Sequence, residues 1–301
     1  MKYFLGIDGG GTRTTAAVSD ENGEFIYKST GKTINFYSVG MENARNNLLE
    51  LMGDIYSEIG EVTFERAFVG CSALDNEAEK EITEALCGGV INAKQIDMNS
   101  DAYVALFSGA CSEPRCVVIC GTGSMAVGID DCGKITVKGG WGHIIGDGGS
   151  AYSIAVNALA EAVNLYDEKN FDEPLVKSVT EFYNAGSLRE IIDILYSENI
   201  TKDIIAEFAR TVAELCDKGD KKALAVLSSE CKKLVRTVAS LVNEIEKCKV
   251  IYLYGGVFQN NKIFKALFVD LMGELYPEIK TELLSVPPEE GALKLARGLY
   301  E

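Results

Sequence analysis

The chain has 301 residues, which at about 150 residues per domain indicates two domains. Its 29 Lys and Arg against 45 Asp and Glu give a net charge of −16, which argues against a nucleic-acid partner because phosphate-binding surfaces need clustered basic residues. The single histidine, His143, excludes a metal site built from several histidines and leaves acid–base chemistry to carboxylates.

The nine cysteines are spread along the chain without a C-x-x-C pair. Several lie in apolar runs, as Cys116 and Cys120 do, so we expect buried, reduced thiols. The N-terminal apolar run stops at Asp8, which is too early for a signal peptide, and no stretch approaches the ~20 apolar residues of a membrane span. We therefore expect a soluble, cytoplasmic protein with no membrane partner.

The first third of the chain mixes strands and helices. The predicted strands are Lys2–Ile7, Thr14–Ser19, Glu24–Thr30, Arg66–Gly70 and Lys94–Met98. The predicted helices are Met41–Ile59, Glu77–Leu86 and Ala102–Phe107. This mixture is typical of an α/β domain.

An internal repeat appears when the chain is compared with itself at an offset of 110 residues, the separation of Gly11 and Gly121. The matching pairs are Gly11 with Gly121, Thr12 with Thr122, Ala16 with Ala126, Asp20 with Asp130, Gly23 with Gly133 and Lys28 with Lys138. Both segments show a strand, a glycine-rich turn, a strand, an Asp/Gly turn and a strand. The repeat predicts two related domains, residues 1–110 and 111–301, joined compactly near residues 109–115.

The second domain carries a long helical insertion, from about Gly146 to Lys247. The predicted helices are Ala151–Tyr166, Glu173–Tyr183, Leu188–Tyr196, Ile204–Asp217 and Ala223–Glu246. A buried strand, Lys249–Tyr254, and a helix, Asn260–Leu275, follow. The last helix, Glu289–Tyr300, begins after Pro287-Pro288, and we expect it to pack on the first domain.

Three glycine turns follow strands. Gly9–Thr12 is neither a Walker A loop nor a Rossmann turn, because Arg13–Val18 continues as a strand rather than a helix. Such a turn exposes backbone N–H groups that attract anions. With the second copy, Cys120–Ser124, it would clamp a polyphosphate across a cleft, while Gly255–Phe258 would serve the nucleoside end. Asp8 suits a hydrated Mg²⁺.

Three segments, Leu5–Thr15, Val117–Ala126 and Ile251–Asn260, resemble the phosphate-1, phosphate-2 and adenosine elements of the acetate/sugar kinase–Hsp70–actin superfamily. Within it, Gly139–Tyr152 resembles the N-acetylglucosamine kinase branch of the BadF/BadG/BcrA/BcrD ATPase family. The resemblance implies two ribonuclease-H-like (actin-like ATPase) domains with a nucleotide cleft between them. The chain departs from some members at Ser229–Lys232, where these have a small-residue pair beside adenine.

The resemblance implies specific site residues. Asp101 matches the catalytic base, with a helix N-cap as its alternative role. Asn35 and Asp147 match sugar-contacting residues; the alternatives are a turn residue and an N-cap. Trp141 and Gly142 would line the sugar pocket, although a solitary Trp is more often part of the core. The implied ATP contacts are Gly10, Gly11, Thr12, Arg13, Gly121, Thr122, Gly123, Ser124, Gly255 and Gly256, with Asp8 holding Mg²⁺ through water.

The function implied is transfer of the ATP γ-phosphoryl group to the 6-hydroxyl of N-acetylglucosamine, N-acetylmuramic acid or both, in cell-wall amino-sugar salvage (peptidoglycan recycling). Homodimers are common in this branch, so a homodimer is expected. One alternative is an ATPase activator of a 2-hydroxyacyl-CoA dehydratase, whose iron–sulfur cluster needs a cysteine pattern that Cys116 and Cys120 do not reproduce. A glucosamine kinase is the other.

Overall fold

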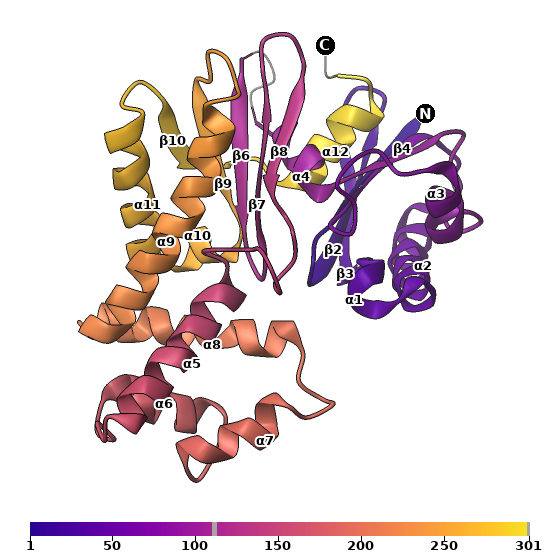
Figure 1. Ribbon diagram of the computed structural model, residues 1–301. Coiled ribbons are helices and arrows are strands. Elements are labelled where there is room, and N and C mark those ends of the chain that lie inside the picture. The colour runs from indigo at the N-terminus through magenta and orange to yellow at the C-terminus, as the bar shows by residue number, and fades with distance from the viewer. Residues whose placement is uncertain (110–112, 300–301) are drawn as a thin grey trace. The chain divides into compact units, whose positions relative to one another are not determined.

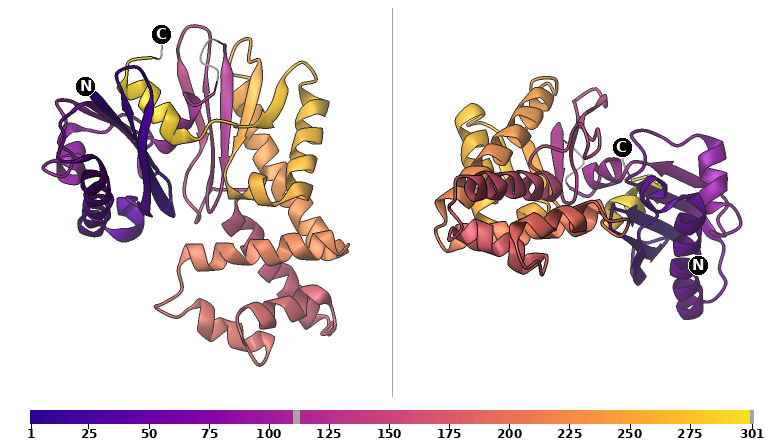
Figure 2. Two further views of the ribbon diagram at one scale, coloured as in Figure 1. Left: turned by 180° about the vertical axis from the view of Figure 1, so that it is seen from behind. Right: turned by 60° about the horizontal axis from the view of Figure 1, so that its bottom comes forward.

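The computed structural model describes residues 1–109 and 113–299. It contains two five-stranded sheets with helices, shown in Figures 1 and 2, and two compact units. The first unit comprises Met1–Val117, Val127–Ile135 and Leu284–Glu301, and the second comprises Val118–Ala126 and Thr136–Leu283. The predicted boundary between residues 110 and 111 lies outside the described residues, as does Cys111, and this boundary stays a prediction.

The first sheet has the order β3-β2-β1-β4-β5. Its strands are β1 (Tyr3–Gly9), β2 (Arg13–Asp20), β3 (Phe25–Lys32), β4 (Phe64–Cys71) and β5 (Ile96–Asn99). The first three strands pair antiparallel, whereas β4 runs parallel to β1 and to β5. Parallel strands end at one edge of a sheet, and the register places Asp8, Gly70 and Asn99 in one row there.

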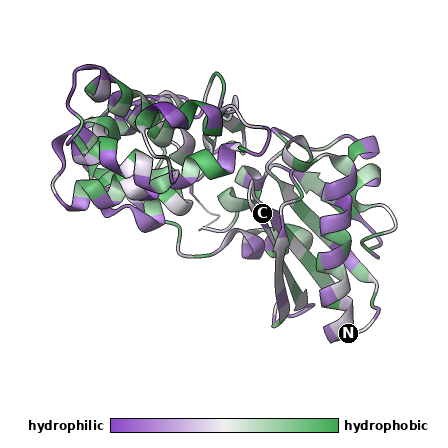
Figure 3. Ribbon diagram, turned by 90° about the horizontal axis from the view of Figure 1, so that it is seen from below, coloured by the Kyte–Doolittle hydropathy of each residue, from purple (hydrophilic) through white to green (hydrophobic). Residues whose placement is uncertain are grey.

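Among the described residues, five helices belong to the first unit: α1 (Phe36–Val39), α2 (Met41–Ile59), α3 (Lys80–Cys87), α4 (Asp101–Leu106) and α12 (Pro288–Ala296). The bounds of α2 match the prediction because Leu48, Met52 and Ile55 recur at helical spacing and are buried against the sheet core. Figure 3 shows such alternation of hydrophobic and hydrophilic residues along the helices. Helix α12 packs on β1 and α4, and it ends before the predicted Tyr300.

The second sheet repeats the strand order of the first. Its strands are β6 (Arg115–Cys120), β7 (Ser124–Ile129), β8 (Ile135–Gly139), β9 (Val250–Tyr254) and β10 (Lys280–Leu283). The spatial order β8-β7-β6-β9-β10 is, in order of sequence, third, second, first, fourth and fifth, the same as in the first sheet. The predicted α/β fold with two related domains is therefore confirmed.

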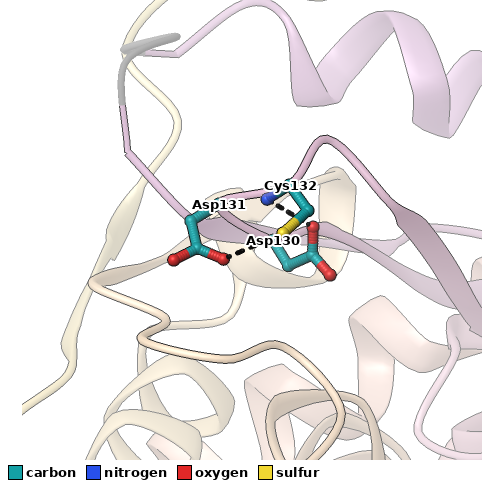
Figure 4. A group of neighbouring side chains, drawn as sticks. All are labelled: Asp130, Asp131 and Cys132. Carbon is teal, nitrogen blue, oxygen red and sulfur yellow. Dashed lines mark hydrogen bonds between the residues drawn. The ribbon is translucent and has the colours of Figure 1, made fainter.

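The Asp/Gly turns of the two repeats agree in their hydrogen bonds. Asp20 Oδ1 accepts from the backbone N–H groups of Asn22 and Glu24 at 2.9 and 2.8 Å. Asp130, 110 positions later, accepts from Cys132 (Figure 4) and from Lys134 at the same two distances. Asp131 and Cys132 lie beside Asp130 within metal-ligand spacing, but the Asp130 carboxylate is occupied by its own turn. The group is therefore explained as a hairpin turn.

The helical insertion lies between β8 and β9. It contains α5 (Ala151–Asp167), α6 (Pro174–Phe182), the 3₁₀ turn η1 (Leu188–Glu190), α7 (Ile191–Leu195), α8 (Lys202–Asp217) and α9 (Lys221–Val242). In Figure 1, α5 to α8 gather below the second sheet, and α9 runs along it. The predicted single helix Leu188–Tyr196 is wrong, because its first turn is 3₁₀ and its remainder is only α7.

The predicted helix Asn260–Leu275 also divides. Its first residue ends α10 (Gly256–Asn260), and Asn261 separates α10 from α11 (Lys262–Leu275). The Asn261 side chain accepts from the N–H of Phe264 at 2.9 Å, which is an N-cap and explains the break.

Seven of the eight cysteines in the described part of the chain are buried, and Cys132 is exposed. Burial raises the pKa of Cys71 and Cys87 to about 12, so these thiols stay protonated. Within residues 1–109 and 113–299, no helix has the length and apolar character needed to cross a membrane.

Candidate active site

In the first unit, Asp8 and Asp101 come from the ends of the two strands that flank β4. Asp8 lies in β1, and Asp101 begins α4 directly after β5. Between them, Gly70 of β4 lets α4 approach the sheet, because a Cβ on Gly70 would lie 2.6 Å from Val104 Cγ2 and 3.3 Å from Asp101 Cα. The glycine thus allows the close placement of Asp101 at this edge.

Asp101 is not the N-cap of its helix. Ser100 takes that role, and its Oγ accepts from the N–H of Tyr103 at 3.1 Å. Asp101 is 9% exposed, and its Oδ1 has no hydrogen-bond partner among the residues that the structure describes. Burial raises the pKa of Asp101 to about 6, opposed by hydrogen bonds from the backbone N–H groups of Ala102 and of Asp101 itself. A carboxylate in this state can accept a proton near neutral pH.

Asp8 lies in a cluster of charges. Burial raises its pKa well above the usual range, and the negative charges of Asp101 and Glu289 raise it further, while Arg13 and Lys28 lower it. Glu289, in the first turn of α12, is 4% exposed and is paired with Lys28. The sequence analysis missed Glu289. The signal was an acidic residue directly after Pro-Pro at a helix start, where the helix dipole stabilises a negative charge.

Asn35 is bound into the phosphate-1 turn through Thr33. The Thr33 hydroxyl donates to the carbonyl oxygen of Gly10 at 2.8 Å and accepts from the Asn35 N–H at 3.0 Å. The Asn35 Oδ1 caps α1, and its Nδ2 donates to the Ser72 hydroxyl at 2.9 Å. Asn35 is therefore a helix N-cap, a role that the sequence analysis did not predict for it, and its Nδ2 has a second N–H to offer. Sequence reasoning missed both Thr33 and Ser72.

Two glycines related by the repeat are not required by the fold. A Cβ on Gly11 or on Gly121 would meet no atom of the described residues within 4 Å, and neither glycine has a positive φ. An alanine would thus fit the folded chain at both places. Glycine there suits the close approach of a ligand to the backbone.

In the second unit, the phosphate-2 turn and Asp147 are in contact. The Asp147 carboxylate accepts a hydrogen bond from the backbone N–H of Ser124, and burial raises its pKa. A Cβ on Gly123 would lie 2.7 Å from Asp147 Oδ2. Asp147 has φ +57° and is not the N-cap of α5, because Ser150 caps that helix by accepting from Ser153 N–H at 3.2 Å. The N-cap alternative for Asp147 is wrong.

Trp141 lies in the loop before Asp147 and is 75% exposed, so the alternative of a core tryptophan is also wrong. Gly142 beside it has φ +79°, a conformation that a β-carbon disfavours. His143 packs edge-on against Tyr152 with ring centroids 4.9 Å apart, which is a packing role.

The third glycine turn lies against the second. A Cβ on Gly255 would be 2.4 Å from the carbonyl oxygen of Cys120, and Gly255 has φ +105°. Gly256 begins the short helix α10 rather than a plain turn. Ser229–Lys232 lies in the middle of α9, not at a helix start.

Comparison with known proteins agrees with this arrangement. A profile of the BadF/BadG/BcrA/BcrD ATPase family matches residues 5–296. The chain is 28% identical to an N-acetylmuramic acid/N-acetylglucosamine kinase of Clostridium acetobutylicum, over 99% of both chains. It is 27% identical to an N-acetyl-D-glucosamine kinase of Dictyostelium discoideum, over 98% of both. The crystal structure of a candidate N-acetylglucosamine kinase from Chromobacterium violaceum shares the fold, with TM-score 0.80 and 18% identity over 98% of this chain and 99% of that one.

Proposed function

Since the chain belongs to the BadF/BadG/BcrA/BcrD ATPase family, we propose that it is an ATP-dependent kinase that phosphorylates the 6-hydroxyl of N-acetylglucosamine, N-acetylmuramic acid or both. The observation that carries the proposal is the buried Asp101 carboxylate, with an Oδ1 that has no partner in the described residues and a pKa near 6. The two full-length relatives named for these sugars support the choice of substrate.

In the proposed reaction, Asp101 accepts the proton of the sugar 6-hydroxyl while the oxygen of that hydroxyl attacks the γ-phosphorus of ATP. The bond from the γ-phosphorus to the bridging oxygen breaks, and ADP leaves with that electron pair. Asp101 then releases its proton to water. Positioning and charge neutralisation supply most of the rate, so the protein needs few reacting groups.

The proposal gives sugar recognition to Asn35, Trp141, Gly142 and Asp147. Asp147 accepts hydrogen bonds from sugar hydroxyls, and Asn35 donates its second amide N–H. Trp141 offers an exposed aromatic face, which packs well against the apolar face of a sugar ring. The exposed Trp141 and the raised pKa of Asp147 support these roles.

ATP phosphates are assigned to two turns, Gly10–Arg13 and Gly121–Ser124, and the adenosine end to Gly255 and Gly256. Gly11 and Gly121 support the first assignment, because glycine is unnecessary there for the fold yet allows a phosphate to approach the backbone closely.

The residues around Asp8 fit a bound Mg²⁺. The negative charges of Asp101 and Glu289 repel that of Asp8, and a divalent cation would relieve this repulsion. Asp8 would hold the hydrated ion, which would supply neutralisation of phosphate charge. A cytoplasmic homodimer acting in cell-wall amino-sugar salvage completes the proposal; size-exclusion chromatography with light scattering tests the dimer.

The proposal is tested by ADP release with ATP and Mg²⁺ in the presence of N-acetylglucosamine, N-acetylmuramic acid, glucosamine or glucose. We expect stimulation by one or both N-acetylated sugars. Stimulation by glucosamine above both would favour the glucosamine kinase alternative, and no stimulation by any amino sugar would refute the proposal.

The dehydratase-activator alternative predicts an iron–sulfur cluster held by thiolates. Cys116 and Cys120 are buried in β6, and burial raises the pKa of Cys120 well above its usual range. Both features disfavour cluster ligation. An iron-free, colourless protein that still phosphorylates an amino sugar would exclude this alternative.

Gly121→Ala and Gly123→Ala should affect the KM values of the two substrates differently. Gly121→Ala should raise the KM for ATP with little change in the KM for sugar, and it should not lower the melting temperature, because its methyl group meets no protein atom in the described residues. Gly123→Ala should raise the KM for sugar, because its methyl group would displace Asp147. Steady-state kinetics of the two variants measure this; an unchanged KM for ATP in Gly121→Ala would remove the turn from phosphate binding.

A further inference from the structure

Glu230 is a buried carboxylate that the proposed reaction does not use. It lies in the middle of α9 and is 1% exposed. Its Oε2 accepts from the backbone N–H of Gly149 at 3.0 Å and from the Ser153 hydroxyl at 2.6 Å, while its Oε1 contacts Lys233 Nζ at 2.5 Å. A buried charge needs such partners, and two of these three belong to the segment that follows Asp147.

The same segment is bonded on its other side to the phosphate-2 turn. The Ser124 hydroxyl donates to the Gly148 carbonyl oxygen at 3.0 Å, and the Cys120 thiol donates to the Gly149 carbonyl oxygen at 3.3 Å. The Ala151 N–H donates to the Gly121 carbonyl oxygen at 2.9 Å. Residues 148–151 are therefore held between Glu230 and the turn, and Asp147 immediately precedes them.

Packing against α9 leaves the segment no room to shift toward the helix. A Cβ on Gly148 would lie 3.0 Å from Lys233 Cβ, and one on Gly149 would lie 2.7 Å from Leu234 Cβ. Gly149 also has φ +84°. The backbone thus rests directly on α9, and Glu230 supplies the polar anchor at this contact.

We propose that Glu230 is a positioning residue that anchors the Asp147 segment to α9 while the segment is bonded to the phosphate-2 turn, so that nucleotide binding at the turn sets the sugar-binding position of Asp147. This inference rests on the proposed function for the identity of the two ligands. Its consequence is positive coupling: the nucleotide strengthens sugar binding, and by linkage the sugar strengthens nucleotide binding by the same factor.

The single tryptophan makes the coupling measurable without a sugar. Trp141 is the only tryptophan of the chain and lies in the loop that leads to Asp147, so its emission reports on that loop. We expect adenylyl imidodiphosphate, a non-hydrolysable ATP analogue, to change Trp141 emission in the wild-type protein. We also expect it to tighten N-acetylglucosamine binding, measured by calorimetry, by at least ~5-fold.

In Glu230→Ala, both effects should disappear while the analogue still binds within ~3-fold of wild type, because Glu230 is not assigned to the nucleotide. Glu230→Gln keeps the shape and one acceptor oxygen, so it should restore part of the coupling; if Glu230→Ala does not fold, the comparison of Glu230→Gln with wild type decides. The matched control is Glu161→Gln, which removes the same charge from a surface pair with Lys222 and should keep the full coupling.

Coupling of wild-type size in both Glu230 variants would overturn the proposal, as would wild-type protein in which the analogue changes neither Trp141 emission nor sugar affinity. A wild-type protein that binds no amino sugar would instead refute the proposed function. In that case the Trp141 measurement still tests Glu230 on its own.

Discussion

Asp101→Asn should lower turnover by at least ~10², because an amide cannot accept the hydroxyl proton that a positioned carboxylate accepts. The affinity for ATP should stay near that of wild type, since Asp101 is assigned to the sugar hydroxyl. ADP release measured with saturating sugar, alongside calorimetry with an ATP analogue, separates the two quantities. A turnover within threefold of wild type would remove Asp101 from proton transfer.

The pH dependence follows from the same carboxylate. Its pKa is raised to about 6, and only the deprotonated form acts as a base. We therefore expect kcat/KM to rise with pH up to about 6 and then to level off. In Asp101→Asn, the rise of kcat/KM below pH 6 should be absent. A wild-type profile that is flat from pH 5 to 7 would contradict the assignment.

Asp101→Asn should also make the protein more stable at pH 8. The pKa of Asp101 is raised from 3.8 to about 6 on folding, so the folded state holds this proton more tightly than the unfolded state. The contribution of Asp101 to the free energy of unfolding is therefore fully present below pH 4 and is lost as the pH rises through 6. The whole shift in pKa corresponds to a loss of about 3 kcal/mol. Asparagine carries no charge to desolvate, and it also relieves the repulsion on Asp8. Urea unfolding at pH 5 and pH 8 should show a gain that is larger at pH 8.

A variant that loses activity and gains stability is the pattern of a residue selected for chemistry rather than for folding. An Asp101→Asn protein less stable than wild type at pH 8 would indicate that the carboxylate serves the fold.

Local signals in the sequence were sufficient for most of the fold. The bounds of α2 follow from the spacing of Leu48, Met52 and Ile55, and the two repeats follow from glycine and aspartate turns whose hydrogen bonds are local. The edge strand β10 was missed because its four residues, Lys280–Leu283, include two charged side chains and give no apolar run.

Residues whose role depends on distant partners gave no such signal. Glu230 looks like one more charged residue of a surface helix, and its burial becomes evident only when Gly149, 81 positions earlier, is placed beside it. Glu289 is similar, since its partner Lys28 is 261 positions away. Asp8 was found from its place at the end of a predicted strand, whereas Asp101 was found through the family resemblance, with which its place between a strand and a helix agrees.

Gly291→Ala should lower the free energy of unfolding, unlike a Gly→Ala substitution at an exposed position of a helix. A Cβ on Gly291 of α12 would lie 2.3 Å from the Val104 carbonyl oxygen and 2.5 Å from the Ser108 Oγ. These atoms belong to α4 and the turn that follows it. Because a backbone carbonyl oxygen can move only together with its helix, α12 and α4 must separate. Overpacking of this kind costs about 1–3 kcal/mol. Thermal unfolding and urea titration measure the loss.

Gly53→Ala is the matched control, because Gly53 lies in α2 of the same unit and its Cβ would meet no atom of the described residues within 4 Å. It should stabilise the protein by about 0.5–1 kcal/mol, as alanine does in a helix interior. Equal stability of the two variants would contradict the close approach of α12 to α4.

Gly291→Ala should also reduce activity, because the helix that Gly291 touches, α4, carries Asp101 at its start. Gly6 and Gly70 place the neighbouring elements in the same way: a Cβ on Gly6 of β1 would lie 2.5 Å from the backbone nitrogen of Leu293 in α12, and Gly70 lies under α4. Three glycines thus set the separation of β1, α4 and α12, and Asp8 and Asp101 depend on that separation for their mutual position. We expect Gly291→Ala to lower kcat at temperatures where the protein remains folded, whereas a loss of stability without any change in kcat would show that α4 keeps its place when α12 moves.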